Sequence, residues 1–216
     1  MDTNNKKELI KQVNSYNIFD NLKSDYFLGK VFNNLKKKKY LELIKYNNDI
    51  KKRMNLNINN YKEYCEKFSS IEIEIIPIKN EYGQFININE EEKIYYHIYF
   101  NDNKEEEIKR NFLNKNDKVT KINIIIDYQI ISFMGLFDDC SNIESIYFKK
   151  FYRNNINDMR YMFDKCYSLK EINLSNFNTN NVTSMNRMFG KCSKELKKKI
   201  RAKYNNIKEE AYGDLF

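Results

Sequence analysis

The second half of the chain repeats its pattern of apolar and polar positions every 26 residues. Cys140, Cys166 and Cys192 follow one another at this spacing. Seven further apolar positions recur in the same register: Ile146, Phe148, Phe151, Ile156, Met159, Met162 and Phe163 return as Ile172, Leu174, Phe177, Val182, Met185, Met188 and Phe189. A fixed period of this length is typical of stacked repeats that share one continuous core.

Each repeat unit contains two shorter periods. Ile146-Tyr147-Phe148 and Ile172-Asn173-Leu174 alternate apolar and polar residues, which predicts a short strand. Val182, Met185, Met188 and Cys192 then follow at steps of three and four, which predicts a helix packed along one side. We therefore expect one strand and one helix in each unit, stacked so that neighbouring units cover each other's apolar faces.

The unit over residues 168–192, with its Met-x-x-Met-Phe-x-x-Cys ending, resembles the BspA-type leucine-rich repeat, and the resemblance covers about residues 119–192. It implies a solenoid that mediates protein–protein contact, without catalytic residues. The expected fold class is α/β, a short leucine-rich-repeat solenoid over residues 119–192. A helical segment (1–68) and a small antiparallel β segment (69–118) would precede it, and a helical cap (193–216) would close it.

The segments around the repeats show their own periods. Ile71, Ile73 and Ile75 alternate with glutamates, which predicts strands over residues 71–100, either as a separate small domain or as a cap of the repeats. Ser193 is a candidate N-cap for a basic helix over residues 194–204.

Apolar residues at helical spacing also mark the N-terminal segment, which resembles an F-box over about residues 22–54. This resemblance implies docking to a Skp-type adaptor of a cullin–RING ubiquitin ligase. The alternative is a helical pair that covers the open end of the solenoid. The adaptor-docking candidates are Leu22, Phe27, Leu28, Val31, Phe32, Leu35 and Leu41.

On the repeats, the polar strand positions are the candidates for partner binding. If Ile146, Phe148, Ile172 and Leu174 face the core, the residues between and after them must face solvent. The partner-binding candidates are Tyr147, Lys149, Asn173 and Ser175.

Composition and motifs restrict the remaining chemistry. A hydrophobic content of 41% argues against disorder, and no apolar run reaches the ~18 residues of a membrane span. The start lacks a secretion signal, so we expect a cytoplasmic protein. The cysteines form no close pairs of the kind that bind zinc, which favours buried, reduced thiols and no metal or cofactor.

His97 lies in a strand-like run without a recognisable catalytic partner, so we interpret it as structural. The basic runs Lys36–Lys39 and Lys197–Lys199 lie among leucines and isoleucines at helical spacing. This pattern favours solvated helix faces over a nucleic-acid site. The sequence thus predicts a non-enzymatic protein-interaction module, either an F-box-like substrate receptor or a plain leucine-rich-repeat binding or adhesin-like protein.

Overall fold

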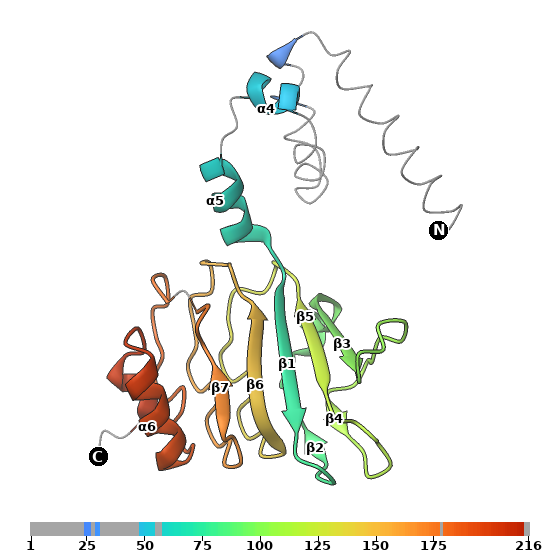
Figure 1. Ribbon diagram of the computed structural model, residues 1–216, viewed down its shortest axis with the longest axis vertical. Coiled ribbons are helices and arrows are strands. Elements are labelled where there is room, and N and C mark those ends of the chain that lie inside the picture. The colour runs from blue at the N-terminus through green and yellow to red at the C-terminus, as the bar shows by residue number, and fades with distance from the viewer. Residues whose placement is uncertain (1–23, 27–28, 31–47, 55–57, 178, 214–216) are drawn as a thin grey trace. The chain divides into compact units, whose positions relative to one another are not determined.

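The computed structural model describes residues 24–26, 29–30, 48–54, 58–177 and 179–213, in two compact units, Met1–Phe68 and Ser69–Phe216 (Figure 1). The described helices of the first unit are α4 (Asn48–Arg53) and α5 (Ile58–Phe68). Arg53 Nε lies 2.8 Å from Asp25 Oδ1 in this unit. In the described part of the chain, no helix reaches the length and hydropathy that a bilayer crossing requires.

A five-stranded mixed sheet is the centre of the second unit, with the order β3-β5-β1-β6-β7 (Figure 1). Its strands are β1 (Ile71–Pro77), β3 (Tyr96–Phe100), β5 (Ile122–Ile126), β6 (Ile143–Lys150) and β7 (Glu171–Asn173). Only β6 and β7 pair in parallel; the other neighbours are antiparallel. Short β2 (Gly83–Gln84) and β4 (Phe112–Leu113) form a second sheet, and α6 (Lys194–Lys203), η1 (Glu90–Tyr95) and η2 (Glu209–Tyr212) complete the described elements.

The alternating apolar residues of the strands form one buried face of this sheet. Ile73 of β1 lies between Ile124 of β5 and Phe148 of β6, and all three are at most 2% exposed. The expected β segment (69–118) and the expected solenoid (119–192) therefore both contribute strands to one sheet, and the expected cap from residue 193 packs on the same core.

The expected fold class, an α/β solenoid with one strand and one helix per unit, is wrong. The described residues form a mixed sheet with few helices, and turns occupy residues 134–139, 160–165 and 186–191, where the repeat pattern predicts helices. We call the three segments 133–140, 159–166 and 185–192 the turn ladder.

Two backbone features prevent helices in the turn ladder. The N–H of Phe137 donates to Met162 O at 2.8 Å, and that of Phe163 donates to Met188 O at 2.8 Å, so these donors bond the next segment instead of their own. Tyr161 and Arg187 also have positive φ angles of 57° and 53°, which an α-helix of L-residues does not accommodate.

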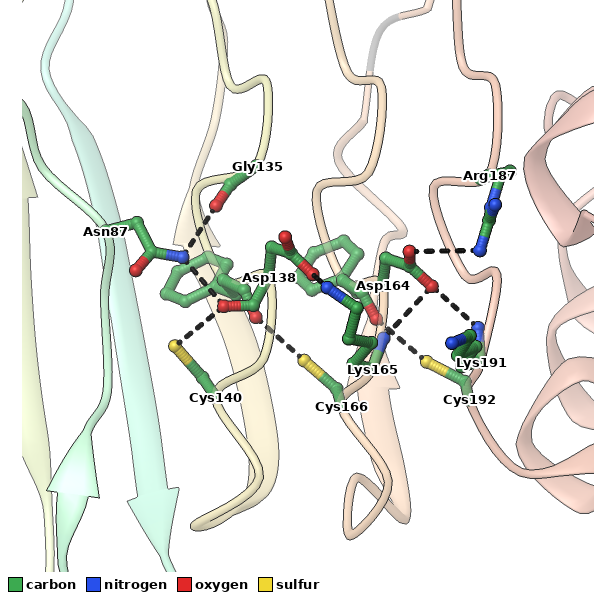
Figure 2. A network of polar contacts seen from close by, with 12 residues as sticks. Asn87, Gly135, Asp138, Cys140, Asp164, Lys165, Cys166, Arg187, Lys191 and Cys192 are labelled. Atoms are coloured by element: carbon green, nitrogen blue, oxygen red, sulfur yellow. Dashed lines mark hydrogen bonds and ion pairs between the residues drawn. The ribbon is translucent and has the colours of Figure 1, made fainter.

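The turn ladder encloses a column of aromatic rings and thiols (Figure 2). Phe163 stacks between Phe137 and Phe189, with ring centroids 5.5 and 5.3 Å away. Cys166 Sγ donates to Phe137 O at 3.0 Å, and Cys192 Sγ repeats this contact with Phe163 O at 3.1 Å. The residues expected to form buried, reduced thiols are indeed free and buried.

Different residues close the two ends of the ladder. At one end, the Asn87 amide donates to Gly135 O at 2.9 Å and to Asp138 O at 2.7 Å (Figure 2). At the other end, the Tyr212 ring stacks 6.0 Å from Phe189. The predicted N-cap is confirmed, because Ser193 accepts the Leu196 N–H at the start of α6.

Candidate functional site

A row of side chains crosses the sheet on the face opposite the core. The strand register places Tyr99 opposite Asn123, Asn123 opposite Glu74, Glu74 opposite Tyr147, and Tyr147 opposite Asn173. Because successive side chains of a strand point to opposite faces, their neighbours Ile98, Ile124 and others fill the core. These five residues are partly exposed, and we call them the polar row.

Charged contacts fix the middle of the polar row. Lys149 Nζ lies 2.9 Å from Glu74 Oε1, and Lys121 Nζ approaches the same carboxylate at 3.9 Å. The Tyr147 hydroxyl donates to Glu171 Oε2 at 2.9 Å. Desolvation, assisted by the Glu171 carboxylate, raises the pKa of the Tyr147 phenol, which therefore stays protonated as a donor.

The predicted partner-binding residues lie on or beside this row. Tyr147 and Asn173 belong to it, and Lys149 is bound to Glu74 within it. Ser175 is exposed just after β7, and its N–H donates to Asn173 Oδ1 at 3.0 Å. The apolar neighbours Ile146, Phe148, Ile172 and Leu174 face the core and are at most 5% exposed.

Three members of the polar row were not among the candidates from the sequence. Glu74 and Tyr99 come from strands that precede the expected solenoid, and Asn123 lies at the start of the solenoid range, before the 26-residue repeats. The alternation of Ile71–Ile75 already indicates that Glu74 points away from the core. The signal that was missing is the strand order, which places β1 directly beside β6.

His97 lies on the same face of the sheet, opposite Ile125, at one margin. Its Nδ1 is 2.9 Å from Glu107 Oε1, and its Nε2 is 3.5 Å from Asp127 Oδ2. These two carboxylates orient the imidazole ring. Through them, His97 connects β3 to the loop that contains Glu107 and to Asp127, which follows β5.

The buried thiols are poor nucleophiles. Burial raises the pKa of Cys192 to about 12, and it also raises the pKa values of Cys140 and Cys166. A thiol reacts as the thiolate, so these cysteines contribute packing and weak hydrogen bonds. Within residues 24–213, as far as they are described, no three His, Cys, Asp or Glu side chains gather as metal ligands would.

The adaptor-docking candidates lie outside the described residues. They are Leu22, Phe27, Leu28, Val31, Phe32, Leu35 and Leu41. Among the described residues, the polar row combines donors, acceptors and aromatic rings, and it can form hydrogen bonds and ion pairs.

Comparison with known proteins gives a family but no activity. A family described as "Mycoplasma protein of unknown function, DUF285" matches residues 107–216, just over half of the chain. These residues include β5, β6, β7, the turn ladder and α6. No curated protein and no solved structure matches the chain. The chain belongs to the DUF285 family of Mycoplasma proteins of unknown function.

Proposed function

We propose that the chain is a non-enzymatic protein-binding module and that the polar row is its contact surface. The observation that carries this proposal is the alignment of Tyr99, Asn123, Glu74, Tyr147 and Asn173 across all five strands. Tyrosines contribute large contact areas at protein interfaces, because an aromatic ring buries much apolar surface and its hydroxyl still forms a hydrogen bond.

The dimensions of the row support a protein as the ligand. Adjacent strands lie ~4.8 Å apart, so a row across five strands is about 19 Å long. This length suits the centre of a standard protein interface better than the pocket of a small metabolite. The backbone of a sheet is already ordered, so binding does not require a loop to become ordered, which favours affinity.

Site-specific crosslinking tests this proposal. A photoreactive amino acid is introduced at Tyr147 of the full chain, and the protein is irradiated in an extract of the source organism. The matched control carries the same group at Tyr167, which is 54% exposed and lies outside the polar row. We expect a discrete adduct from the Tyr147 position that the Tyr167 position does not give.

The partner identified by this adduct then allows a measurement of affinity. Replacing Asn173 by arginine puts a bulky charge into the row without disturbing the core, and we expect binding about tenfold weaker or worse, as at interface hot spots. Equal adducts from both positions, or unchanged affinity of Asn173→Arg, would refute the proposed surface.

The ligase-adaptor role rests on the sequence of residues 22–54 alone and stays a prediction. A pull-down with a purified Skp-type adaptor tests it: Phe32→Asp should abolish capture, and failure of the parent chain to bind the adaptor rejects the role. Either result is independent of the polar row.

A further inference from the structure

Charge is distributed unevenly along the second unit. Residues 69–148 contain 15 Asp and Glu against 8 Lys and Arg, whereas residues 149–213 contain 6 against 15. The two parts nearly cancel in the total charge, so the composition of the unit conceals a strong separation of charge.

The negative charge gathers beside β3, the first edge of the sheet. Residues 90–107, which we call the acidic edge, comprise η1, β3 and the loop that follows, with seven carboxylates and two lysines. Glu91, Glu105 and Glu106 are exposed. Ile94, between the glutamates of η1 and the strand, is 70% exposed and adds an apolar contact to this edge.

The positive charge gathers beyond β7, at the other edge. Residues 187–213, which we call the basic edge, contain nine Lys and Arg against three Glu. Leu196, Lys197 and Ile200 turn α6 toward the core, where the Lys197 amine donates to Gly190 O and Tyr212 O. The opposite side of the helix exposes Lys194, Lys198 and Lys203.

The sheet holds these two edges apart. In the order β3-β5-β1-β6-β7, three strands separate β3 from β7, and α6 lies on the far side of β7 from β3 (Figure 1). The edges cannot neutralise each other within one molecule across this distance, which exceeds the ~8–10 Å over which physiological salt screens exposed charges.

We propose that a second copy of this chain docks on α6, with the acidic edge of one molecule against the basic edge of the next. The two contact surfaces are different, so the interface is heterologous, and each docked copy presents a free edge for another. Exposed ion pairs are individually weak and are screened by salt, so the association needs several pairs and dissolves as the ionic strength rises.

Charge reversal on the full-length chain tests this docking. One variant, Glu91→Lys/Glu105→Lys/Glu106→Lys, leaves the acidic edge with four carboxylates against five lysines, so it no longer attracts a basic surface. Another, Lys194→Glu/Lys198→Glu/Lys203→Glu, leaves the basic edge with six Lys and Arg against six Glu and therefore without net charge. Sedimentation velocity at low salt should show self-association of the parent that disappears at high salt. Each variant alone should sediment as a monomer, and an equimolar mixture of the two should associate again.

A matched control carries the same change in net charge elsewhere. Lys79, Lys115 and Lys118 are exposed and lie outside both edges, so Lys79→Glu/Lys115→Glu/Lys118→Glu should associate like the parent. Recovery in the mixture also excludes misfolding as the cause of the loss. A monomeric parent at low salt, loss of association in the control, or no recovery in the mixture overturns the proposal. Association that survives reversal of the α6 lysines also overturns it, since it places the basic partner outside α6.

Discussion

At the scale of single residues, Asp164 connects the second and third segments of the turn ladder. This carboxylate is 3% exposed and accepts the N–H of Lys165 at 3.1 Å and of Lys191 at 2.8 Å (Figure 2). Arg187 Nη2 lies 3.4 Å from its second oxygen. Gly190 follows 26 residues later in the repeat, and a Cβ added there would meet Asp164 Oδ1 at 2.5 Å. The absence of a side chain at Gly190 therefore leaves room for the buried carboxylate.

This geometry predicts coupled effects on stability. Gly190→Ala should lower the free energy of unfolding by about 1–3 kcal/mol, because Asp164 must leave its hydrogen-bonding position. In an Asp164→Ala background the same change should cost clearly less, because the clashing oxygen is gone. Urea unfolding of both single variants and the double variant gives the coupling free energy. Additive effects of the two changes would show that the clash is relieved without loss of these hydrogen bonds.

At the scale of elements, the sequence predicts strands better than it predicts the segments between them. The alternation at Ile71–Ile75 and Ile146–Phe148 corresponds to β1 and β6. The three- and four-residue steps do reflect local turns, since the N–H of Met188 bonds Met185 O, three residues back. The backbone N–H of the following residue bonds a carbonyl of another segment instead of extending the turn. The spacing of apolar residues does not show which carbonyl a backbone N–H will bond.

The candidate site was predictable to the same extent. Alternation is a local property, so it placed Tyr147 and Asn173 on the solvent side. The assembly of the polar row depends on pairing Glu74 with Tyr147 across 73 positions of the chain. Such long-range register depends on the whole core, because every strand pair must bury its apolar side at once. A single periodicity cannot supply it.

Tyr204, which follows α6, covers the edge of the sheet at β7. Its hydroxyl accepts the Leu174 N–H at 3.1 Å and lies 3.4 Å from Ile172 O. Tyr204→Phe should lower the free energy of unfolding by about 1–3 kcal/mol, because a buried backbone donor loses its partner. Amide exchange at Leu174 should accelerate in the same variant.

The matched control for this prediction is Tyr167→Phe. Tyr167 is 54% exposed, so removal of its hydroxyl should change the free energy of unfolding by less than about 0.5 kcal/mol. If the two variants unfold at the same urea concentration, the Tyr204 hydroxyl does not stabilise the β7 edge.

At the scale of the whole molecule, one core extends from the sheet through the turn ladder to α6. Cys140, Cys166 and Cys192 lie along it and are at most 6% exposed. The thiols are buried only while this shared core is folded. Their pKa values therefore change when the whole unit unfolds. Their pKa values are raised by burial, and that of Cys192 reaches about 12, against an ordinary value of 9.0.

This difference predicts a loss of stability at alkaline pH. Below pH 9 the thiols are protonated in both states, so their contribution is fully present. As the pH rises through 9, the unfolded chain releases protons that the folded chain keeps, and the free energy of unfolding falls. Each thiol contributes a slope of up to ~1.4 kcal/mol per pH unit, and three thiols together up to about 4.

Urea unfolding under reducing conditions between pH 7 and pH 9.5 measures this slope, since most tyrosines of the unfolded chain, with a pKa of about 10, are still protonated in this range. Cys192→Ala is less stable at pH 7 because it opens a cavity. Its stability should nevertheless fall less than that of the parent between pH 8.5 and pH 9.5, because one of the three titrating thiols is gone and the thiol contribution to the slope is about a third smaller. The comparison of slopes separates titration from packing. A parent protein whose stability does not change above pH 9, or a variant with an unchanged slope, would mean that the thiols reach water in the folded chain.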